Sequence, residues 1–129
     1  MKQVFSTDTI WEQKVAYSRA IRVGNVVEVA GTTAVLNDKI MHPENASKQA
    51  EVIFGKIALA LEKVGAKMQD VIRTRMYLTN INDFEAVGKI HGIVFKGINP
   101  VSTLLEVSAL VDPKLVVEIE VSAIIDQDA

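Results

Sequence analysis

The chain has 129 residues, of which 14 are basic and 16 are acidic, so its formal net charge is −2. This length fits one domain, which we expect to span residues 1–129, and the 49% of apolar residues is enough for one hydrophobic core. Cysteine is absent, which excludes disulfides, thiolate nucleophiles and cysteine-ligated metal sites. The weakly acidic balance argues against general binding of nucleic acid.

The N-terminal residues lack the apolar stretch of a secretion signal, and no apolar run approaches the roughly 18 residues that a membrane span requires. We therefore expect a soluble, cytoplasmic protein without a membrane partner. The two histidines, His42 and His91, are too few for a histidine-rich zinc centre, and we expect no metal site.

The first third of the chain reads as strands. Residues 20–23 and 26–30 are rich in β-forming side chains, and the Gly24-Asn25 pair between them predicts a two-residue hairpin turn. A further extended segment is predicted over residues 32–36, followed by a polar turn at Asn37-Asp38.

A helix is predicted to run to about Val64, with Asn45 or Ser47 as its N-cap and Gly65 as its stop. Apolar residues recur along it at the spacing of one buried helix face. They are Ala46, Ala50, Ile53, Phe54, Ile57, Leu61 and Val64.

A strand over residues 71–78 and a second helix are predicted next. Alternation puts Ile72, Thr74, Met76 and Leu78 on one face of the strand, and Arg73, Arg75 and Tyr77 on the other. The helix is expected to begin after an Asn82 cap and to end near Gly97. Its apolar face comprises Phe84, Val87, Ile90 or His91, Val94 and Phe95.

The chain ends in two predicted strands, at about residues 102–110 and 115–125. In the last strand Val117, Ile119, Val121 and Ala123 alternate with Glu118, Glu120 and Ser122. The resulting order β-β-β-α-β-α-β-β predicts an α+β fold, in which two helices cover one face of an antiparallel or mixed sheet. The uncovered face predicts oligomerisation.

Five short segments match, in order, the pattern of a known family. They are Tyr17-Ser18-Arg19-Ala20, Val29-Ala30-Gly31-Thr32, Arg73-Thr74-Arg75-Met76-Tyr77-Leu78, Asn82-Asp83-Phe84 and Val117-Glu118-Ile119-Glu120. In these segments and their spacing, nearly the whole chain resembles the Rid/YjgF family, also catalogued as the L-PSP endoribonuclease family. The resemblance implies a chorismate-mutase-like fold that forms a homotrimer with a central β-barrel, outer helices and three clefts between subunits.

The resemblance also implies a chemistry for those clefts. In one branch of the family they hydrolyse 2-imino acids to 2-keto acids and ammonia without a metal or organic cofactor. A tyrosine that closes the site corresponds to Tyr17, and a glutamate that handles water or a proton corresponds to Glu118. The arginine that grips the substrate carboxylate corresponds to Ser102, two residues after Pro100.

At Ser102 the chain departs from the family pattern, because a neutral hydroxyl cannot replace a two-pronged guanidinium. An asparagine and a tyrosine that are usual in the second helix appear here as Gly88 and His91. The chain therefore resembles a branch of the family that lacks the carboxylate-binding arginine, and an altered substrate range is expected.

Other residues are candidates for binding the substrate or for proton transfer. Arg75 and Arg19 could bind an anion, although pairing of Arg75 with glutamates across strands or subunits is the structural alternative. Glu106 shares a predicted strand face with Ser102 and could point to the cleft mouth or pair with an arginine. His91 could act as a general acid or base, or be a hydrogen-bonded residue at the edge of its helix.

The sequence leaves three functions open. The first is hydrolysis of a small imine, enamine or related C–N bond, with Glu118 steering water. The second is a trimer that binds a small metabolite, or a protein partner, without turnover. The third and weakest is an endoribonuclease, against which the acidic balance speaks.

Overall fold

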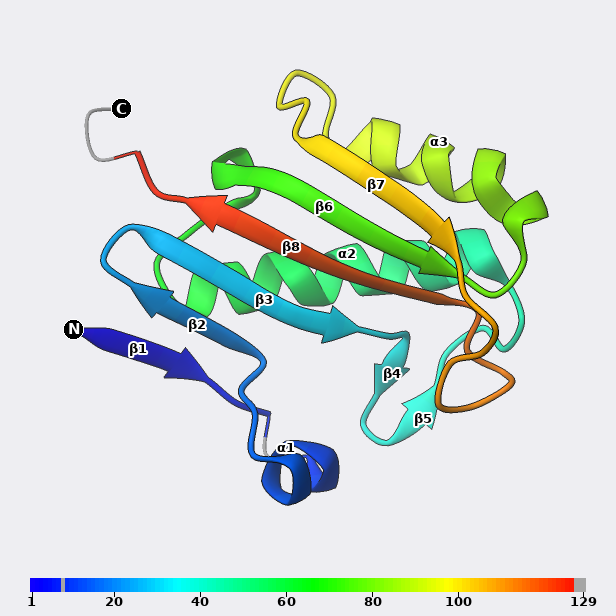
Figure 1. Ribbon diagram of the computed structural model, residues 1–129, viewed down its shortest axis with the longest axis horizontal. Coiled ribbons are helices and arrows are strands. Elements are labelled where there is room, and N and C mark those ends of the chain that lie inside the picture. The colour runs from blue at the N-terminus through cyan, green and yellow to red at the C-terminus, as the bar shows by residue number, and fades with distance from the viewer. Residues whose placement is uncertain (8, 127–129) are drawn as a thin grey trace.

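The computed structural model describes residues 1–7 and 9–126 of the chain. Its main element is a six-stranded sheet with the order β1-β2-β3-β8-β6-β7 (Figure 1). The strands are β1 (Lys2–Phe5), β2 (Ala20–Val23), β3 (Val26–Thr32), β6 (Val71–Leu78), β7 (Val101–Glu106) and β8 (Val117–Ile124). Neighbouring strands are antiparallel except β6 and β7, which pair in parallel, so the sheet is mixed.

Two helices, α2 (Ala46–Lys63) and α3 (Phe84–Val94), contact each other and lie behind the sheet in the view of Figure 1. The predicted α+β architecture, with two helices on one face of the sheet, is thereby confirmed. A short helix, α1 (Ile10–Val15), lies below the sheet in this view. No helix within the described ranges is long and apolar enough to cross a membrane.

The core lies between the sheet and α2, as the apolar periodicity predicted. Asn45 caps α2 by accepting a hydrogen bond from the backbone amide of Lys48 (3.1 Å), and Gly65 follows the helix with φ +85°. Four apolar residues of β8 complete the core, each at most 1% exposed: Val117, Ile119, Val121 and Ala123. Each fully buried valine or isoleucine contributes about 1.5–3 kcal/mol.

The β2–β3 hairpin forms as predicted, with Val23 paired to Val26 across the two-residue turn and Gly24 at φ +60°. The extended segment predicted over residues 32–36 is not one continuous strand. Thr32 ends β3, and a separate pair follows, β4 (Val35–Leu36) with β5 (Lys39–Ile40). The predicted turn between these two strands is correct, because Asn37 and Asp38 both adopt positive φ.

The predicted face of β6 is wrong at Ile72, which is 46% exposed, whereas Val71 is buried. The register of β6 against β8 shifts between Val71 and Arg73. One extra residue at this bulge turns Ile72 away from the core, and the predicted alternation holds from Arg73 onward.

The start of the second helix also differs from the prediction. Asn80, rather than Asn82, supplies the cap: its side chain accepts a hydrogen bond from the Asn82 amide (2.9 Å) and opens the 3-10 turn η2 (Ile81–Asp83). The helix α3 then begins at Phe84, with Asp83 at its N-cap. A second 3-10 turn, η1 (Met68–Asp70), precedes β6.

Gln49 is a buried polar residue that fixes the approach to β8. Its side-chain amide donates to the carbonyls of His42 (3.0 Å) and Lys114 (2.8 Å), and its carbonyl accepts from the Val116 amide (2.9 Å). One side chain on α2 thus bonds three backbone groups in the segments that lead into α2 and β8. The residue before β8 is held in place, and with it the start of the strand that carries Glu118.

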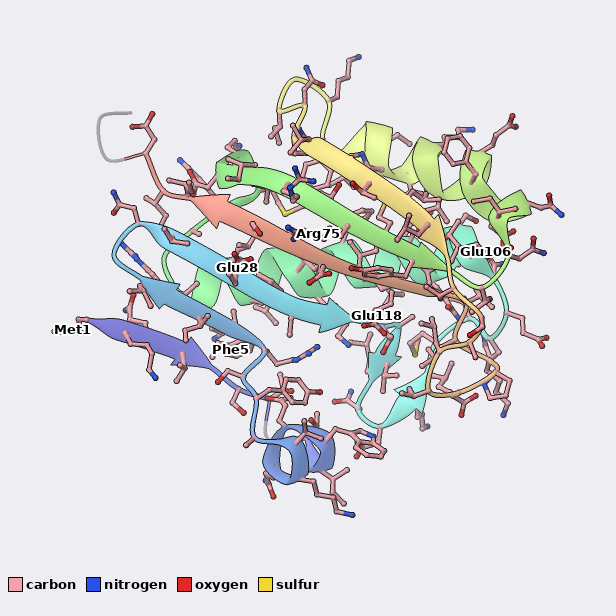
Figure 2. All side chains as sticks on the ribbon, in the orientation of Figure 1. Met1, Phe5, Glu28, Arg75, Glu106 and Glu118 are labelled. Atoms are coloured by element: carbon pink, nitrogen blue, oxygen red, sulfur yellow. The ribbon has the colours of Figure 1, made fainter. Side chains whose placement is uncertain are left out.

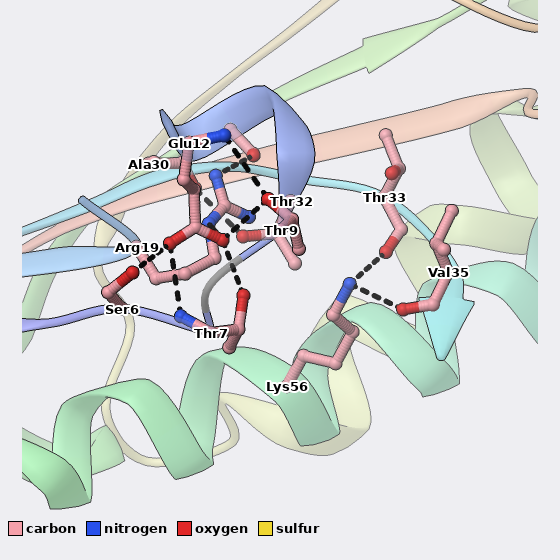
Figure 3. Close-up of polar contacts among 11 residues, drawn as sticks. Ser6, Thr7, Thr9, Glu12, Arg19, Ala30, Thr32, Thr33, Val35 and Lys56 are labelled. Atoms are coloured by element: carbon pink, nitrogen blue, oxygen red, sulfur yellow. Dashed lines mark hydrogen bonds and ion pairs between the residues drawn. The ribbon is translucent and has the colours of Figure 1, made fainter. Parts of the chain in front are cut away.

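Glu12 on α1 is a buried carboxylate, 4% exposed, to which several residues of the N-terminal segment are hydrogen-bonded (Figure 3). It accepts hydrogen bonds from the Ser6 hydroxyl (2.7 Å), the Thr9 hydroxyl (2.9 Å), and both the amide (3.0 Å) and the hydroxyl of Thr7. Arg19 Nε lies 3.8 Å from the same carboxylate. Burial by itself would raise the pKa of Glu12. The hydrogen bonds together have the larger effect, and they lower the pKa to about 2.

Glu12 therefore stabilises the fold only while it is ionised. Its folded pKa of about 2 lies below the ordinary 4.5, so the stabilisation is complete above pH 4.5 and disappears as the pH falls towards 2. We expect Glu12→Gln to lower the free energy of unfolding by roughly 2–3 kcal/mol at pH 7, because several charge-assisted hydrogen bonds are lost. Urea unfolding at pH 7, 4 and 2.5 measures the free energy of unfolding of both proteins. The difference between the variant and the wild type should become smaller as the pH falls.

The matched control is Glu51→Gln, which changes an exposed glutamate of α2 and should leave stability within about 0.5 kcal/mol of the wild type. If the difference in free energy of unfolding between Glu12→Gln and the wild type stays constant from pH 7 to pH 2.5, Glu12 does not stabilise the fold through its ionised form.

Candidate active site

One face of the sheet is not covered by helices, and it carries two polar rows. Alternation along β6 and β8 turns these side chains away from α2, and cross-strand register brings them together in pairs. The pairs are Tyr77 with Glu118, Arg75 with Glu120, and Arg73 with Ser122. Figure 2 shows Arg75, Glu28 and Glu118 lying over this open face.

Glu118 lies directly against the backbone of Gly31. A β-carbon placed on Gly31 would be 2.2 Å from Glu118 Oε2, so only glycine leaves room for the carboxylate in this position. Burial raises the pKa of Glu118, the positive charge of Arg19 lowers it, and the negative charge of Glu120 raises it again; the net shift is upward. A half-buried carboxylate with a raised pKa is suited to accept and return a proton.

Arg19 joins Tyr17 to this group. Its guanidinium donates to the Gly31 carbonyl (2.9 Å) and lies 5.3 Å from the centre of the Tyr17 ring, within cation–π range. Its Nε is buried without a hydrogen-bond partner. The structure thus brings three of the predicted site residues together around Gly31: Tyr17, Arg19 and Glu118.

Lys56 on α2 fixes the segment that follows Gly31 (Figure 3). Its ammonium donates to the carbonyls of Thr33 and Val35, at 2.8 Å each. Burial and the charge of Arg19 lower the pKa of Lys56 to about 8, although Glu12 opposes the shift. These bonds hold the end of β3 against α2 and so hold Gly31 in place beside Glu118.

A hollow of about 570 Å³ opens beside Tyr17 on the open face, between β1, β2, β3 and β8. Glu28 and Glu120 contribute carboxylates to its walls, while Val4 and Ile21 make part of it apolar. This volume is within the range of small-molecule sites. The open face therefore has room for a small ligand next to Tyr17.

Arg75 shares the open face but does not pair with the carboxylates that were considered for it. In the described part of the chain, no ion pair within 4.0 Å joins Arg75 to Glu106, Glu118 or Glu120. The Tyr77 hydroxyl donates to Glu120 instead, and this bond and burial raise the pKa of Tyr77. The pairing of Arg75 within one chain is therefore not formed.

His91 and Ser102 lie on the other side of the sheet, and Thr74 joins them. Thr74 is fully buried, and its hydroxyl oxygen is 2.8 Å from His91 Nε2 and 2.8 Å from Ser102 Oγ. The His91 ring packs against Phe54 and Phe95, with ring centres 6.0 Å and 4.6 Å away. Burial lowers the pKa of His91. These two predicted site residues thus form a group of their own, away from Glu118 on the opposite face.

Glu106 occupies the same side of β7 as Ser102, as predicted, and pairs in register with Leu78. Its carboxylate accepts a hydrogen bond from the Ile81 amide (2.9 Å), which places it at the start of η2. The predicted pairing of Glu106 with an arginine is not formed within the described ranges. The structure gives Glu106 a local bond to the backbone.

Two residues that were not among the predicted site residues are central to these groups. Gly31 is required by the close approach of Glu118, and Thr74 bridges His91 to Ser102. A signal for Thr74 was available, since it is a polar residue in the buried row that includes Met76 and Leu78. Within the described residues, no group of three or more His, Asp or Glu side chains is arranged to hold a metal ion.

Comparison with known proteins connects this geometry to a family. The family model for endoribonuclease L-PSP matches residues 9–125. The uncharacterized protein SCO2049 of Streptomyces coelicolor is 37% identical over 88% of this chain and 84% of its own length. A 2-iminobutanoate/2-iminopropanoate deaminase of Dermatophagoides farinae is 30% identical over 97% of this chain and 98% of its own.

A solved structure agrees with these matches. Rv2704 from Mycobacterium tuberculosis, described as a member of the YjgF/YER057c/UK114 family, superposes with a TM-score of 0.89. It is 38% identical and covers 97% of this chain and 100% of its own. Because the family model spans nearly the whole chain and both relatives and structure agree with it, the chain belongs to the L-PSP endoribonuclease family, which is also named Rid or YjgF.

Proposed function

We propose that the protein hydrolyses the C–N bond of small reactive imines or enamines in the cytoplasm, without a cofactor. The carboxylate of Glu118, pressed against Gly31 and held near Arg19, carries this proposal. The relative from Dermatophagoides farinae, whose name states an imine deaminase activity, supports it.

The chemistry follows from the placement of Glu118. Its carboxylate takes a proton from a water molecule as the water oxygen bonds to the imine carbon, and it passes that proton to the imine nitrogen. In the resulting carbinolamine, Glu118 takes the hydroxyl proton and passes it to the amine nitrogen, so that the C–N bond breaks, the oxygen forms a carbonyl and ammonia leaves. The balance is one imine and one water to one carbonyl compound and one ammonia.

The substrate range is altered relative to imine deaminases that bind a carboxylate. Ser102 stands where the family pattern resembled by this chain has an arginine, and a hydroxyl brings no charge to that position. Tyr17, Arg19 and Arg75 remain as groups on the open face that can orient a substrate.

The protein acts as a homotrimer whose open sheet faces meet, so that the small-molecule clefts lie between subunits. Large apolar side chains that a single chain leaves exposed on this face support the proposal. They are Val4, Val23, Val26, Val101, Leu105 and Ile124, each 45–57% exposed.

A non-catalytic trimer that binds a small metabolite is the second candidate. The observation that favours it is the neutral Ser102 at the position where the family pattern has an arginine, because a neutral side chain there removes one means of binding the carboxylate of an imino acid. Turnover of an imine separates the two candidates.

We expect the wild type to accelerate the loss of a small imine, and Glu118→Gln to lower that rate at least a hundredfold, because the amide cannot take a proton from water. The assay generates imines in situ with an amine or amino-acid oxidase and follows the remainder by semicarbazide trapping. Glu120→Gln changes the neighbouring carboxylate of the same row and should cost less than tenfold. Equal losses in both variants would argue against a specific role for Glu118.

The dependence of the rate on pH is a second test of the proposed role of Glu118 as the group that takes the proton. The rate should rise with pH as Glu118 loses its proton, with a midpoint above the ordinary value for glutamate because its pKa is raised. Arg19→Gln removes a positive charge that favours the ionised form, so the midpoint should move to higher pH. Arg22→Gln is the control: among the described residues the Arg22 side chain bonds to the Gly24 and Val64 carbonyls, so its replacement should leave the midpoint unchanged.

Sedimentation velocity tests the assembly. We expect one species of three times the chain mass of 14.1 kDa. Leu105→Glu, on the open face, should shift it to monomer, because a charge would be buried at the interface. Ile93→Glu, at an equally apolar and 67% exposed position on α3, should remain trimeric. A wild-type monomer would remove the proposed clefts between subunits.

A further inference from the structure

The carboxylate of Glu12 has no acceptor site left for Arg19. It accepts four hydrogen bonds from the segment before α1, from the Ser6 hydroxyl and the Thr7 amide on Oε1 and from the hydroxyls of Thr7 and Thr9 on Oε2. An ionised carboxylate offers about four such sites. Arg19 Nε lies 3.8 Å from Oε2 and is buried without a hydrogen-bond partner among the described residues. Glu12 therefore holds Arg19 by charge.

Two cations bind carbonyl groups of the same stretch of backbone, at the end of β3 and just after it. Arg19 donates to the carbonyl of Gly31 (2.9 Å), and Lys56 donates to those of Thr33 and Val35 (2.8 Å each) (Figure 3). Backbone carbonyls accept these bonds without neutralising the positive charges. The two side chains therefore repel each other, and the charge of Arg19 lowers the pKa of Lys56.

Glu12 is a counter-ion that both cations share. Its charge raises the pKa of Lys56, whereas the charge of Arg19 lowers it, so the three groups interact. Glu12 is 4% exposed and the Arg19 side chain is 13% exposed, so water screens their charges only weakly. Without the charge of Glu12, the repulsion from Lys56 would drive Arg19 away from Gly31.

Arg19 connects this buried charge to the candidate active site. The Gly31 carbonyl that it binds belongs to the residue whose backbone lies against Glu118 Oε2. The guanidinium also lies 5.3 Å from the centre of the Tyr17 ring, and the Glu12 carbonyl accepts from the Tyr17 amide (3.1 Å). The positive charge of Arg19 lowers the pKa of Glu118. A displacement of Arg19 would therefore remove its contact with Tyr17 and raise the pKa of Glu118.

We propose that Glu12 is a positioning residue for the candidate active site, where it acts as the shared counter-ion of Arg19 and Lys56. It keeps Arg19 bonded to Gly31, and thereby keeps a fixed positive charge beside Glu118. The proposal rests on the role proposed for Glu118 in turnover, but the positions and charges of these groups can be measured on the protein without a substrate.

The test is a ¹³C NMR titration of the Glu118 carboxyl in the wild type and in Glu12→Gln, with Glu118→Gln to assign the signal. Among the described residues, Arg19, Glu120 and Tyr77 are the charged or titratable groups that act on Glu118. If Arg19 leaves its place in Glu12→Gln, the midpoint of Glu118 rises, by roughly half a pH unit or more. If Arg19 stays, the loss of a negative charge lowers the midpoint or leaves it unchanged. The direction of the shift therefore separates a positioning role from a role in stability alone.

The Nε–H group of Arg19 gives a second readout. In the wild type its ¹H–¹⁵N signal, assigned with Arg19→Gln, should exchange slowly with solvent because the group is buried. Glu12→Gln should make this exchange faster by about tenfold or more. Glu12→Asp keeps the charge and should restore both the slow exchange and the Glu118 midpoint. Ser6→Ala is the matched control, because it removes one hydrogen bond from Glu12 but leaves the charge in place, and it should change neither readout.

A compensating variant keeps the test decisive if Glu12→Gln does not fold. Lys56→Gln removes the second cation, so the double variant Glu12→Gln/Lys56→Gln keeps the balance of charge around Arg19. It should be more stable than Glu12→Gln alone, by the midpoint of urea unfolding, and should recover part of the slow exchange of Arg19. If Glu12 served only to bond the N-terminal segment, the two losses of stability would add.

Three results would overturn the inference. They are a Glu118 midpoint that stays or falls in folded Glu12→Gln, an unchanged exchange of Arg19 in that variant, and a double variant no more stable than Glu12→Gln. The imine assay distinguishes these from a failure of the proposed function. Turnover by the wild type with an unchanged Glu118 midpoint in Glu12→Gln removes the inference and keeps the function. A raised midpoint without turnover by the wild type keeps the placement of Arg19 and removes the proposed reaction.

Discussion

The two-residue alternation along β6 and β8 is the constraint on which the molecule depends. Each strand has one row against α2 and another on the open face, and the register between them aligns both rows. Burial of Val117, Ile119 and Val121 therefore determines where Glu118 and Glu120 point. A shift of the register by one residue would bury the carboxylates and expose the core, so stability and the placement of the candidate site have the same cause.

Strongly periodic segments could be predicted from the sequence. The buried face of α2, the limits of β6 and the alternation of β8 all follow from side-chain spacing, and the hairpin turn follows from Gly24-Asn25. The strand β1 and the helix α1 were not predicted, because four and six residues are too few to establish a period. The bulge at Ile72 has no local signature, since it appears only when β6 is laid against β8.

The candidate site was predictable only in part, for a related reason. Proximity of Tyr17 and Arg19 follows from the sequence, but their approach to Glu118 depends on Gly31, where a strand from another part of the chain passes without a side chain. The separation of Ser102 from Glu118 could not be read from their positions in the sequence. It depends on the parallel register that pairs Ser102 with Thr74 and so turns it towards the helices. Within the described chain the predicted site residues thus form two groups on opposite faces of the sheet.

The position of β8 has a consequence for how the chain is made. This strand is last in the sequence, yet it lies between β3 and β6 in the centre of the sheet. Until residues 117–124 join the sheet, the β2–β3 hairpin and the β6-α3-β7 unit have no strand in common. The edges of β3 and β6 that β8 joins are then unpaired, and unpaired strand edges favour premature association. Because β8 carries Glu118, the candidate catalytic group reaches its place on the sheet only when the two parts of the sheet are joined.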